Sequence, residues 1–251
     1  MKNLIQAILV LLLSGCASAP QAGGLVDVSV YDRSTGEVLK LYRHQGKLFV
    51  AGRPGDKYAV RLNNKSDTRM LTVLSVDGVN AITGETAAPS QSGYVLDPYA
   101  NAEITGWRKS MSDVATFVFT ALPQSYAART GRPENVGVIG VAVFREYEPP
   151  RTQAPPAPAL SSRNGAAESS TADASGAERA KKTERLGTGH GERETSPVQY
   201  TEFQRATEQP NEVIRIYYDS YANLVARGVI AARAVPDPNP FPAQFVPDPR
   251  G

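Results

Sequence analysis

Residues 136–144 read Val-Gly-Val-Ile-Gly-Val-Ala-Val-Phe, and residues 114–119 read Val-Ala-Thr-Phe-Val-Phe. β-Branched and aromatic residues dominate both stretches, which is typical of β-strands. Because nearly every position is apolar, both are expected to be central strands that are covered on two sides. Gly137 and Gly140 leave room for a close neighbour or a bend. We therefore expect strands over residues 113–120 and 136–147 at the centre of a β-fold.

Shorter runs with the alternating period of a strand precede these two stretches and are separated by polar turns. The Asp77-Gly78 pair is the strongest hairpin signal, because both turn positions need positive φ and these residue types tolerate it. A turn at residues 34–36 predicts a hairpin whose arms are residues 26–30 and 38–42. Further strands are expected over residues 47–51, 57–62, 70–76, 93–96 and 102–107.

The composition agrees with many short strands. The chain holds 19 prolines and 21 glycines, and 8% of its residues are aromatic, which suits a turn-rich β-fold better than a helical bundle. Ser125 resembles the N-cap of a single helical turn that Gly131 ends. We expect a mainly β protein, an antiparallel β-sandwich in preference to a barrel, with a short C-terminal β-α unit and a disordered linker.

The proposed sandwich domain spans residues 25–148, and the composition changes after it. Residues 149–185 are mostly Pro, Ala, Ser, Thr, Gly and charged groups, so they are expected to form a disordered linker. Order is expected to return over residues 186–235, as a Gly-rich loop and a β-α unit that docks on the sandwich. Its strand covers residues 212–218, and Ser220 caps its helix.

A proline-rich tail follows over residues 236–251 and contains Phe241 and Phe245. Two arrangements remain open for this extended segment. It lies over the domain surface with the two phenylalanines packed against it, or it is free to bind a partner, as proline-rich peptides often do.

The N-terminus has the pattern of a secretory signal. Lys2 precedes an apolar run over residues 4–13 that is too short to cross a bilayer, which needs about twenty residues of helix. Residues 13–16, Leu-Ser-Gly-Cys, resemble the lipobox of bacterial lipoproteins. The resemblance implies a signal peptide over residues 1–15, cleavage before Cys16 and acylation of that cysteine, and a flexible tether over residues 16–24 would follow. The alternative is a plain signal cleaved near residues 17–19.

The lipid anchor agrees with the use of cysteine, because Cys16 is the only one in the chain. Two or three acyl chains give stable membrane attachment, whereas one holds only marginally. By resemblance to enterobacterial sorting, Ala17 in place of Asp implies the outer membrane, with the periplasmic side favoured over the cell surface. Removal of Lys2 from 27 basic residues leaves 26 against 25 acidic ones, and no basic cluster indicates nucleic-acid binding.

A candidate binding surface lies between residues 93 and 110. Tyr94, Tyr99, Trp107 and Arg108 fall in expected loops or strand ends there, and Tyr, Trp and Arg are enriched at interfaces. The alternative is that these side chains form the half-buried rim of the sandwich.

The string Gly187-Thr-Gly-His-Gly-Glu-Arg-Glu194 is the most unusual local sequence. His190, Glu192 and Glu194 are candidate metal ligands, although a structural zinc normally has four. The alternative is a Gly-rich entry to the last β-α unit, with glycine chosen for its torsion angles. The string is not a P-loop, because no Lys-Ser or Lys-Thr follows its last glycine.

Support for catalysis is weak. The chain has no Gly-x-Ser-x-Gly elbow, and its one cysteine is assigned to the anchor. Ser110 and Ser112 have no evident base, and Asp97 and Glu103 are only neighbours in sequence. We therefore expect no catalytic residues and no cofactor.

Beyond the lipobox, five segments resemble proteobacterial lipoproteins: residues 76–84, 93–94, 104–110, 129–133 and 186–194. The resemblance implies no activity, cofactor or partner. We expect a lipid-anchored envelope protein whose non-catalytic β domain binds an envelope protein or a glycan as an adaptor or assembly factor. The alternative function is a periplasmic metal-binding protein or hydrolase centred on His190.

The lipid anchor can be tested through the only cysteine. Cys16→Ser removes the thiol that would carry the lipid, so the variant should leave the membrane fraction and appear in the soluble fraction. Cell fractionation with immunodetection measures this, and Ser18→Ala is a matched control that should stay with the membrane. A Cys16→Ser protein that still sediments with lipid would show that the lipobox interpretation is wrong.

Overall fold

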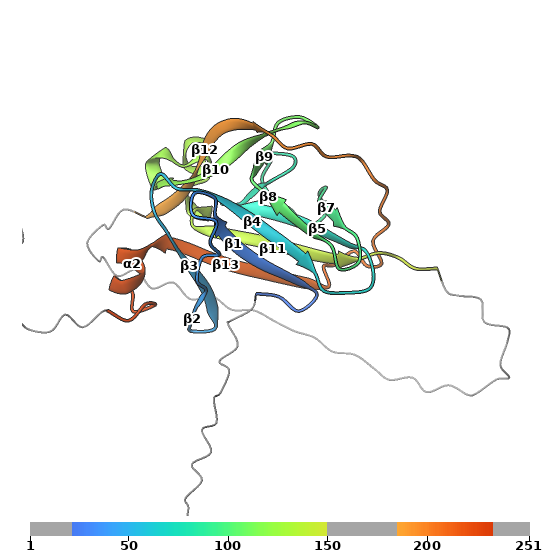
Figure 1. The fold of residues 1–251 in the computed structure, drawn as a ribbon, viewed down its shortest axis with the longest axis horizontal. Helices are drawn as coiled ribbons and strands as arrows, with labels where there is room; N and C mark the ends of the chain where they lie inside the picture. The colour runs from blue at the N-terminus through green and yellow to red at the C-terminus, as the bar shows by residue number, and fades with distance from the viewer. Residues whose placement is uncertain (1–21, 150–184, 233–251) are drawn as a thin grey trace, which may run out of the picture.

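The computed structural model describes residues 22–149 and 185–232. These residues form two β-sheets packed face to face, as Figure 1 shows. The expected mainly β sandwich is therefore confirmed. The expected signal peptide (1–15), most of the expected linker and the tail (236–251) lie outside the described residues.

Sheet A contains six strands within the described chain, along the path β1-β4-β10-β12 with β8 beside β4 and β9 beside β10. Their bounds are Val26–Asp32 (β1), Lys57–Asn64 (β4), Asn101–Ile104 (β8), Gly106–Arg108 (β9), Asp113–Ala121 (β10) and Leu186–Thr195 (β12).

Sheet B contains seven strands within the same part of the chain, along the path β2-β3-β13-β11-β5-β6 with β7 beside β5. Their bounds are Tyr42–His44 (β2), Lys47–Gly52 (β3), Met70–Val76 (β5), Val79–Asn80 (β6), Tyr94–Leu96 (β7), Val138–Arg145 (β11) and Glu212–Ser220 (β13).

The two apolar stretches are central strands, as the sequence predicts. β10 lies between β4 and β12, and β11 lies between β13 and β5. The predicted hairpin turn is also confirmed, because Asp77 and Gly78 both have positive φ between β5 and β6.

The C-terminal β-α unit is part of the sandwich. β13 pairs antiparallel with β11 on one side and parallel with β3 on the other. The unit that was expected to dock on the sandwich joins one of its sheets, because β13 supplies a central strand of sheet B.

The expected hairpin over residues 26–42 forms only beside its turn, where Asp32 N donates to the Glu37 carbonyl oxygen and Leu39 N donates to that of Val30. β1 pairs with β4 in sheet A, whereas β2 pairs with β3 in sheet B. Val38 forms only a single bridge, to Tyr31, and Leu39 and Leu41 pack against the core. The chain thus crosses from one sheet to the other after the turn, and its two partly buried leucines pack against the core on the way.

The expected Gly-rich loop over residues 186–194 is also wrong, because these residues form β12. Its glycines have no positive φ and are needed for close packing. A Cβ on Gly187 would lie 2.6 Å from Ser125 and Val136 side-chain carbons, and one on Gly191 would lie 2.3 Å from Thr116 Oγ1. The glycines of β12 are therefore explained by close packing and not, as the sequence suggested, by their torsion angles.

One expected strand, residues 102–107, is divided into β8 and β9. β8 pairs with β4 and β9 pairs with β10. A Cβ on Gly106 would lie 2.1 Å from the carbonyl oxygen of Ala115, so this close approach requires glycine.

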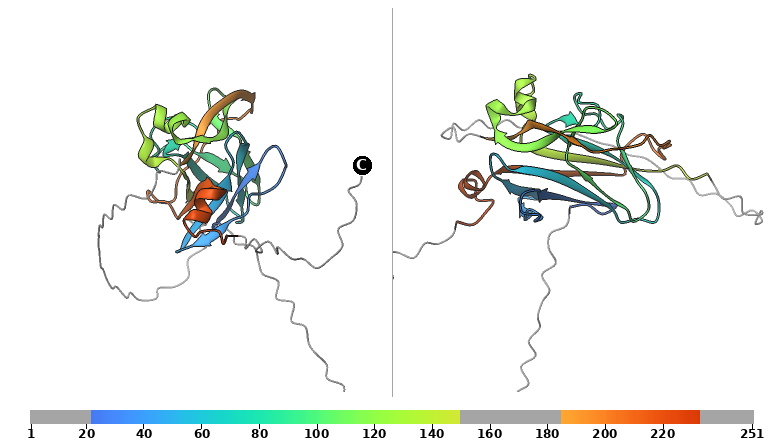
Figure 2. Two further views of the ribbon diagram at one scale, coloured as in Figure 1. Left: turned by 90° about the vertical axis from the view of Figure 1, so that its left-hand side faces the viewer. Right: turned by 45° about the horizontal axis from the view of Figure 1, so that its top comes forward.

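Short helices lie near one end of the sandwich (Figure 2). They are η1 (Leu122–Gln124), α1 (Tyr126–Arg129), η2 (Pro133–Asn135) and α2 (Tyr221–Ala226). The predicted caps are confirmed, because the Ser125 hydroxyl accepts from Ala128 N and the Ser220 hydroxyl accepts from Asn223 N. Within the described residues, none of the helices is long and apolar enough to span a bilayer.

The first described residues pack onto the domain. Ala22 is buried, and the amides of Gly24 and Leu25 donate hydrogen bonds to the Glu212 carboxylate. The expected flexible tether over residues 16–24 is thus corrected for residues 22–24, which the start of β13 holds in place.

A chain of buried hydroxyl groups joins the two sheets through the apolar core. The hydroxyl of Tyr58 is 2.6 Å from Thr188 Oγ1, which is 2.6 Å from the hydroxyl of Tyr218. The Tyr218 hydroxyl donates to Asp77 Oδ1. Because an ionised carboxylate only accepts, we infer that the hydroxyls donate in the order Tyr58, Thr188, Tyr218. The first two belong to sheet A and the last to sheet B.

Asp77 also receives two backbone hydrogen bonds. Gly137 N donates to Oδ1 at 2.9 Å and Thr188 N donates to Oδ2 at 2.8 Å. Burial raises the pKa of Asp77 to about 6, against the opposing effect of these hydrogen bonds. Burial likewise raises the pKa values of Tyr58 and Tyr218 well above the usual value.

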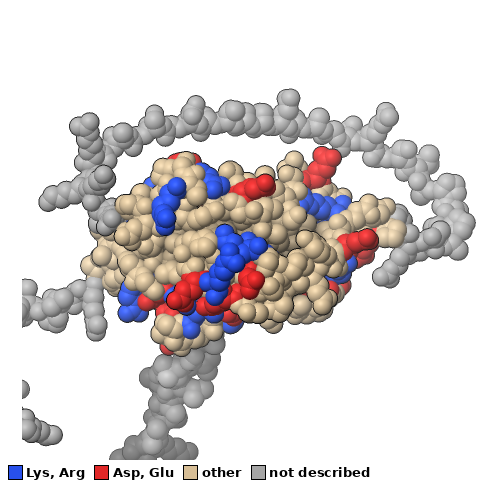
Figure 3. Space-filling view, turned by 90° about the horizontal axis from the view of Figure 1, so that it is seen from above, with Lys and Arg blue, Asp and Glu red and all other residues tan. Residues whose placement is uncertain are grey.

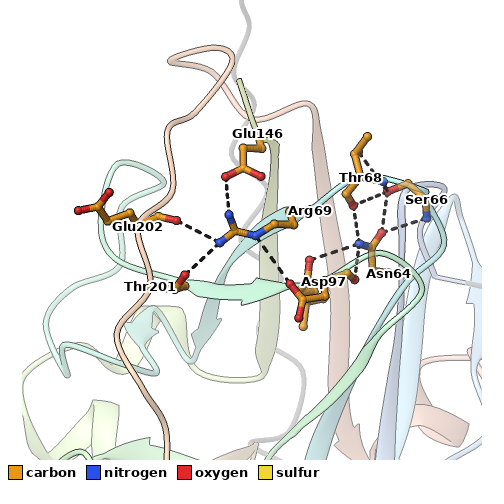
Figure 4. Close-up of polar contacts among 9 residues, drawn as sticks. Asn64, Ser66, Thr68, Arg69, Asp97, Glu146, Thr201 and Glu202 are labelled. Carbon is orange, nitrogen blue, oxygen red and sulfur yellow. Dashed lines mark hydrogen bonds and ion pairs between the residues drawn. The ribbon is translucent and has the colours of Figure 1, made fainter. Parts of the chain in front are cut away.

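A second polar cluster ties the other end of the sandwich together (Figure 4). The Arg69 guanidinium lies 2.7 Å from Glu146 and 3.7 Å from Asp97. It also donates to the Thr201 hydroxyl and to the Glu202 carbonyl oxygen. Arg69 therefore helps to hold the segment between β12 and β13 against the sandwich, together with backbone hydrogen bonds such as those from Tyr147 N to the Gln204 carbonyl oxygen and from Ala206 N to that of Arg145.

Asp77 should give stability a characteristic pH dependence. Its folded-state pKa of about 6 exceeds the usual 3.8, so its contribution is fully present below pH 4 and is lost as pH rises to 6. The advantage of the wild type over Asp77→Asn in the free energy of unfolding should fall by up to about 3 kcal/mol across this window.

Urea denaturation at several pH values measures this difference. The exposed-site variant Glu37→Gln is the control and should track the wild type. A wild-type advantage over Asp77→Asn that stays constant or grows between pH 4 and pH 6 would contradict the prediction.

Candidate binding site

A polar cleft of about 300 Å³ lies at the end of the sandwich where β13 leads into α2. Its walls come from β3, β13, the segment from η2 to β11, the start of β12 and the residue after α2. The side chains most relevant to binding are Lys47, Phe49, Glu134, Arg185, Tyr217, Asp219 and Arg227. This volume lies at the lower limit of typical ligand sites.

The parallel pairing of β3 with β13 builds the aromatic floor of the cleft. Phe49 and Tyr217 are register partners, and their ring centroids lie 5.6 Å apart. Leu224 and Ile230 pack against Phe49 from the side of α2. The floor is therefore held by two strands and the helix.

Asp219 fixes the wall between β13, β12 and α2. Its Oδ1 accepts from Leu186 N, from Ser220 N and from the Asn223 side chain. Its Oδ2 lies 3.4 Å from Arg227. These bonds occupy the carboxylate, so it is poorly placed to receive a ligand.

The cleft carries an excess of positive charge, with three basic against two acidic side chains. The Lys47 ammonium lies 5.3 Å from the centroid of the Tyr217 ring, and Arg185 donates to the Val136 carbonyl oxygen. Within the described residues, neither cation forms an ion pair with a carboxylate. This arrangement suits a ligand that presents an acidic group beside a flat, weakly polar surface.

The ionisable side chains that line the cleft are Lys, Arg, Asp, Glu and Tyr. Its described lining contains no His, Cys, Ser or Thr side chain that would act as a nucleophile or base. The fixed cations and aromatic rings of the lining can contact an acidic ligand.

The predicted metal ligands are divided between two faces of β12. A β-bulge inserts one extra residue between His190 and Arg193, opposite Ala115 and Phe117 of β10. His190 therefore faces Trp107 and Tyr126, with ring centroids 6.5 and 5.6 Å away. Without the bulge, alternate residues of the strand would share one face.

Glu192 and Glu194 face Lys57, at 2.9 and 3.2 Å, and Glu194 also pairs with Arg33. Burial opposes ionisation of Glu194, but Arg33 and Lys57 together lower its pKa. Burial and the nearby Lys109 lower the pKa of His190. Within the described residues, no group of three His, Cys, Asp or Glu side chains is arranged to hold a metal ion.

The four predicted binding residues do not form one exposed surface. Trp107 is buried, and its ring contacts Phe117 and Tyr126. Tyr94 is partly buried, and burial raises its pKa, while Arg108 nearby has the opposite effect. The Arg108 guanidinium donates to the carbonyl oxygen of Ser196. Only Tyr99 projects into solvent, with 68% of its surface exposed.

The sequence did not indicate the cleft, because β3 and β13 are far apart along the chain and pair in parallel. The exposed surface offers no stronger candidate on the side seen in Figure 3, where basic and acidic side chains lie next to one another. On the described surface, Lys57 pairs with Glu192 and Arg61 pairs with Glu103. Cys16 lies outside the described residues.

No family model, curated protein or solved structure matches this chain. The residues of the cleft and the sequence are the features that bear on function.

The burial of the predicted binding residues leads to a test. Trp107→Ala should lower the free energy of unfolding by about 3–5 kcal/mol, because it opens a large cavity in the core. Tyr99→Ala should change it by less than about 0.5 kcal/mol, because the side chain is exposed. Chemical denaturation measures both, and similar losses for the two variants would contradict the packing described.

Proposed function

We propose that this protein is a lipid-anchored envelope protein whose non-catalytic β-sandwich binds a protein or glycan partner in an adaptor or assembly role. The observation that carries the proposal is the polar cleft at the end of β13, with its fixed walls and two cations, Lys47 and Arg185, that no carboxylate of the described residues pairs. The lipobox residues at 13–16 support the membrane anchor, and residue 17 supports the outer membrane.

The position of the cleft suits a protein held at a lipid surface. Ala22 is the sixth residue after Cys16, which limits the span between them to about 20 Å. The anchored segment meets the sandwich at Glu212, whereas the cleft contains Asp219 of the same strand, about 23 Å further along. A partner in the cleft would therefore bind away from the point at which the anchor enters.

The charge of the cleft favours a partner that offers a carboxylate. Among the described residues, Lys47 and Arg185 have no carboxylate partner, and the Lys47 ammonium lies over the Tyr217 ring. Acidic side chains and acidic sugars share this chemistry. The alternative function centred on His190 has no comparable cleft, because its expected ligands are divided between two faces of β12.

Charge reversal in the cleft tests the proposal. Lys47→Glu with Arg185→Glu should reduce the recovery of the partner by about tenfold or more, because two charge-assisted contacts become repulsive. The measurement is cross-linking in living cells, followed by purification of the full lipidated protein and quantification of what is joined to it.

Arg145→Glu with Arg193→Glu is the matched control, since it makes the same charge change at exposed residues outside the cleft. Equal recovery from the cleft variant and the wild type would overturn the role of the cleft. Selective loss with Tyr99→Ala would favour the surface near residue 99 instead. Recovery of only lipid and background from the wild type would contradict partner binding itself.

A further inference from the structure

An apolar groove of about 240 Å³ lies on the outer face of sheet B, on the side away from sheet A. β5, β11 and β13 form its floor, and residues 87–89 form one wall. The floor is made of small or apolar side chains, since it contains Val73, Ser75, Gly140, Ala142 and Val213. Val213 is 43% exposed, although it lies in a central strand.

The rest of this face is covered by the chain itself. Towards one end, Phe203 packs against Leu71 and Phe144, and the Arg205 guanidinium lies 4.2 Å from the centroid of the Phe144 ring. Towards the other end, the segment containing α2 packs on Phe49. The groove is the stretch that remains between these two covers.

The described chain leaves the domain on the same face. Ile230 packs against Phe49, and the last described residue is Ala232. The distance from Tyr217, under this segment, to Val213 in the groove is four strand residues, or about 13 Å. Nine extended residues lead from Ala232 to Phe241 and reach about 28 Å, so the groove is within range of the tail.

The proline, phenylalanine and aspartate residues of the tail are suited to binding in an open apolar groove. Proline occupies every second position over residues 236–242 and again at 247 and 249, and this composition favours an extended chain that loses little entropy on binding. Phe241 and Phe245 lie four residues apart, or about 12 Å in such a chain. Asp237 and Asp248 complement Arg215, which lines the groove.

We propose that residues 236–251 dock in the groove on the outer face of sheet B of the same molecule, with Phe241 and Phe245 packed on its floor. The tail then forms the third cover of this face. A second copy of the chain and a partner protein are the competing occupants.

Disulfide trapping tests the docking. In the full chain carrying Cys16→Ser, no other thiol is present, so Ser75→Cys and Ala243→Cys supply one pair. Ser75 lines the groove, and residue 243 lies between the two phenylalanines. Under mild oxidation this pair should close within the monomer about tenfold faster than the control pair Ser29→Cys and Ala243→Cys, because docking raises the local concentration.

Two further variants separate docking from random encounter. Phe241→Ala with Phe245→Ala should lower the closure rate at position 75 to that of the control. Val213→Asp should do the same, because it places a charge on the floor at an exposed position that tolerates substitution.

Each other outcome overturns the proposal. Equal closure rates at positions 75 and 29 would show that the tail has no preference for the groove. A rate at position 75 that neither variant changes would show that the phenylalanines and the floor do not hold it. A disulfide-linked dimer, formed faster at higher protein concentration, would assign the groove to the tail of a second copy.

Discussion

The chain of hydroxyl groups that ends on Asp77 constrains how the two sheets are packed. Its members come from both sheets, with Tyr58 and Thr188 in sheet A and Tyr218 in sheet B. A buried polar group that loses its partner costs about 1–3 kcal/mol, so only a narrow range of sheet positions satisfies all of them. Apolar contacts alone are less directional and tolerate repacking. The core therefore supplies the free energy of burial, while the hydroxyl chain supplies the alignment.

The same network forms the back of the cleft. Gly137 donates its amide to Asp77 and also lines the cleft, and Tyr218 lies in both. Asp219, the next residue, binds β12 and α2 and closes the side wall. A cleft built on buried hydrogen bonds has walls that are ordered before a ligand arrives. Binding a ligand in such a cleft would then cost less conformational entropy, so fewer charged contacts would be needed for a given affinity.

The sequence predicted the features that depend on local patterns. The runs that became β10 and β11, the Asp77-Gly78 turn and the caps at Ser125 and Ser220 each carry their signal within a few residues. The features it missed depend on partners far away in the chain. Trp107 is buried because β9 pairs with β10 at Gly106, and His190 faces Trp107 because a bulge in β12 changes the alternation. The glycines of β12 are required by Ser125, Val136 and Thr116, which a strand pattern does not reveal.

The outer faces of the two sheets differ in polarity, and therefore in whether another segment must cover them. Sheet A carries charged side chains such as Lys57 and Arg61, which pair with acids and remain solvated, so it needs no cover. β5 and β11 are apolar on both faces, and the sequence pattern of residues 136–144 already required a cover on two sides. Sheet A covers one side, and the segments around Phe203 and α2 cover the ends of the other. Val213 and Gly140 lie between those ends, so the groove is the stretch of this face that the proposed docking of residues 236–251 would cover.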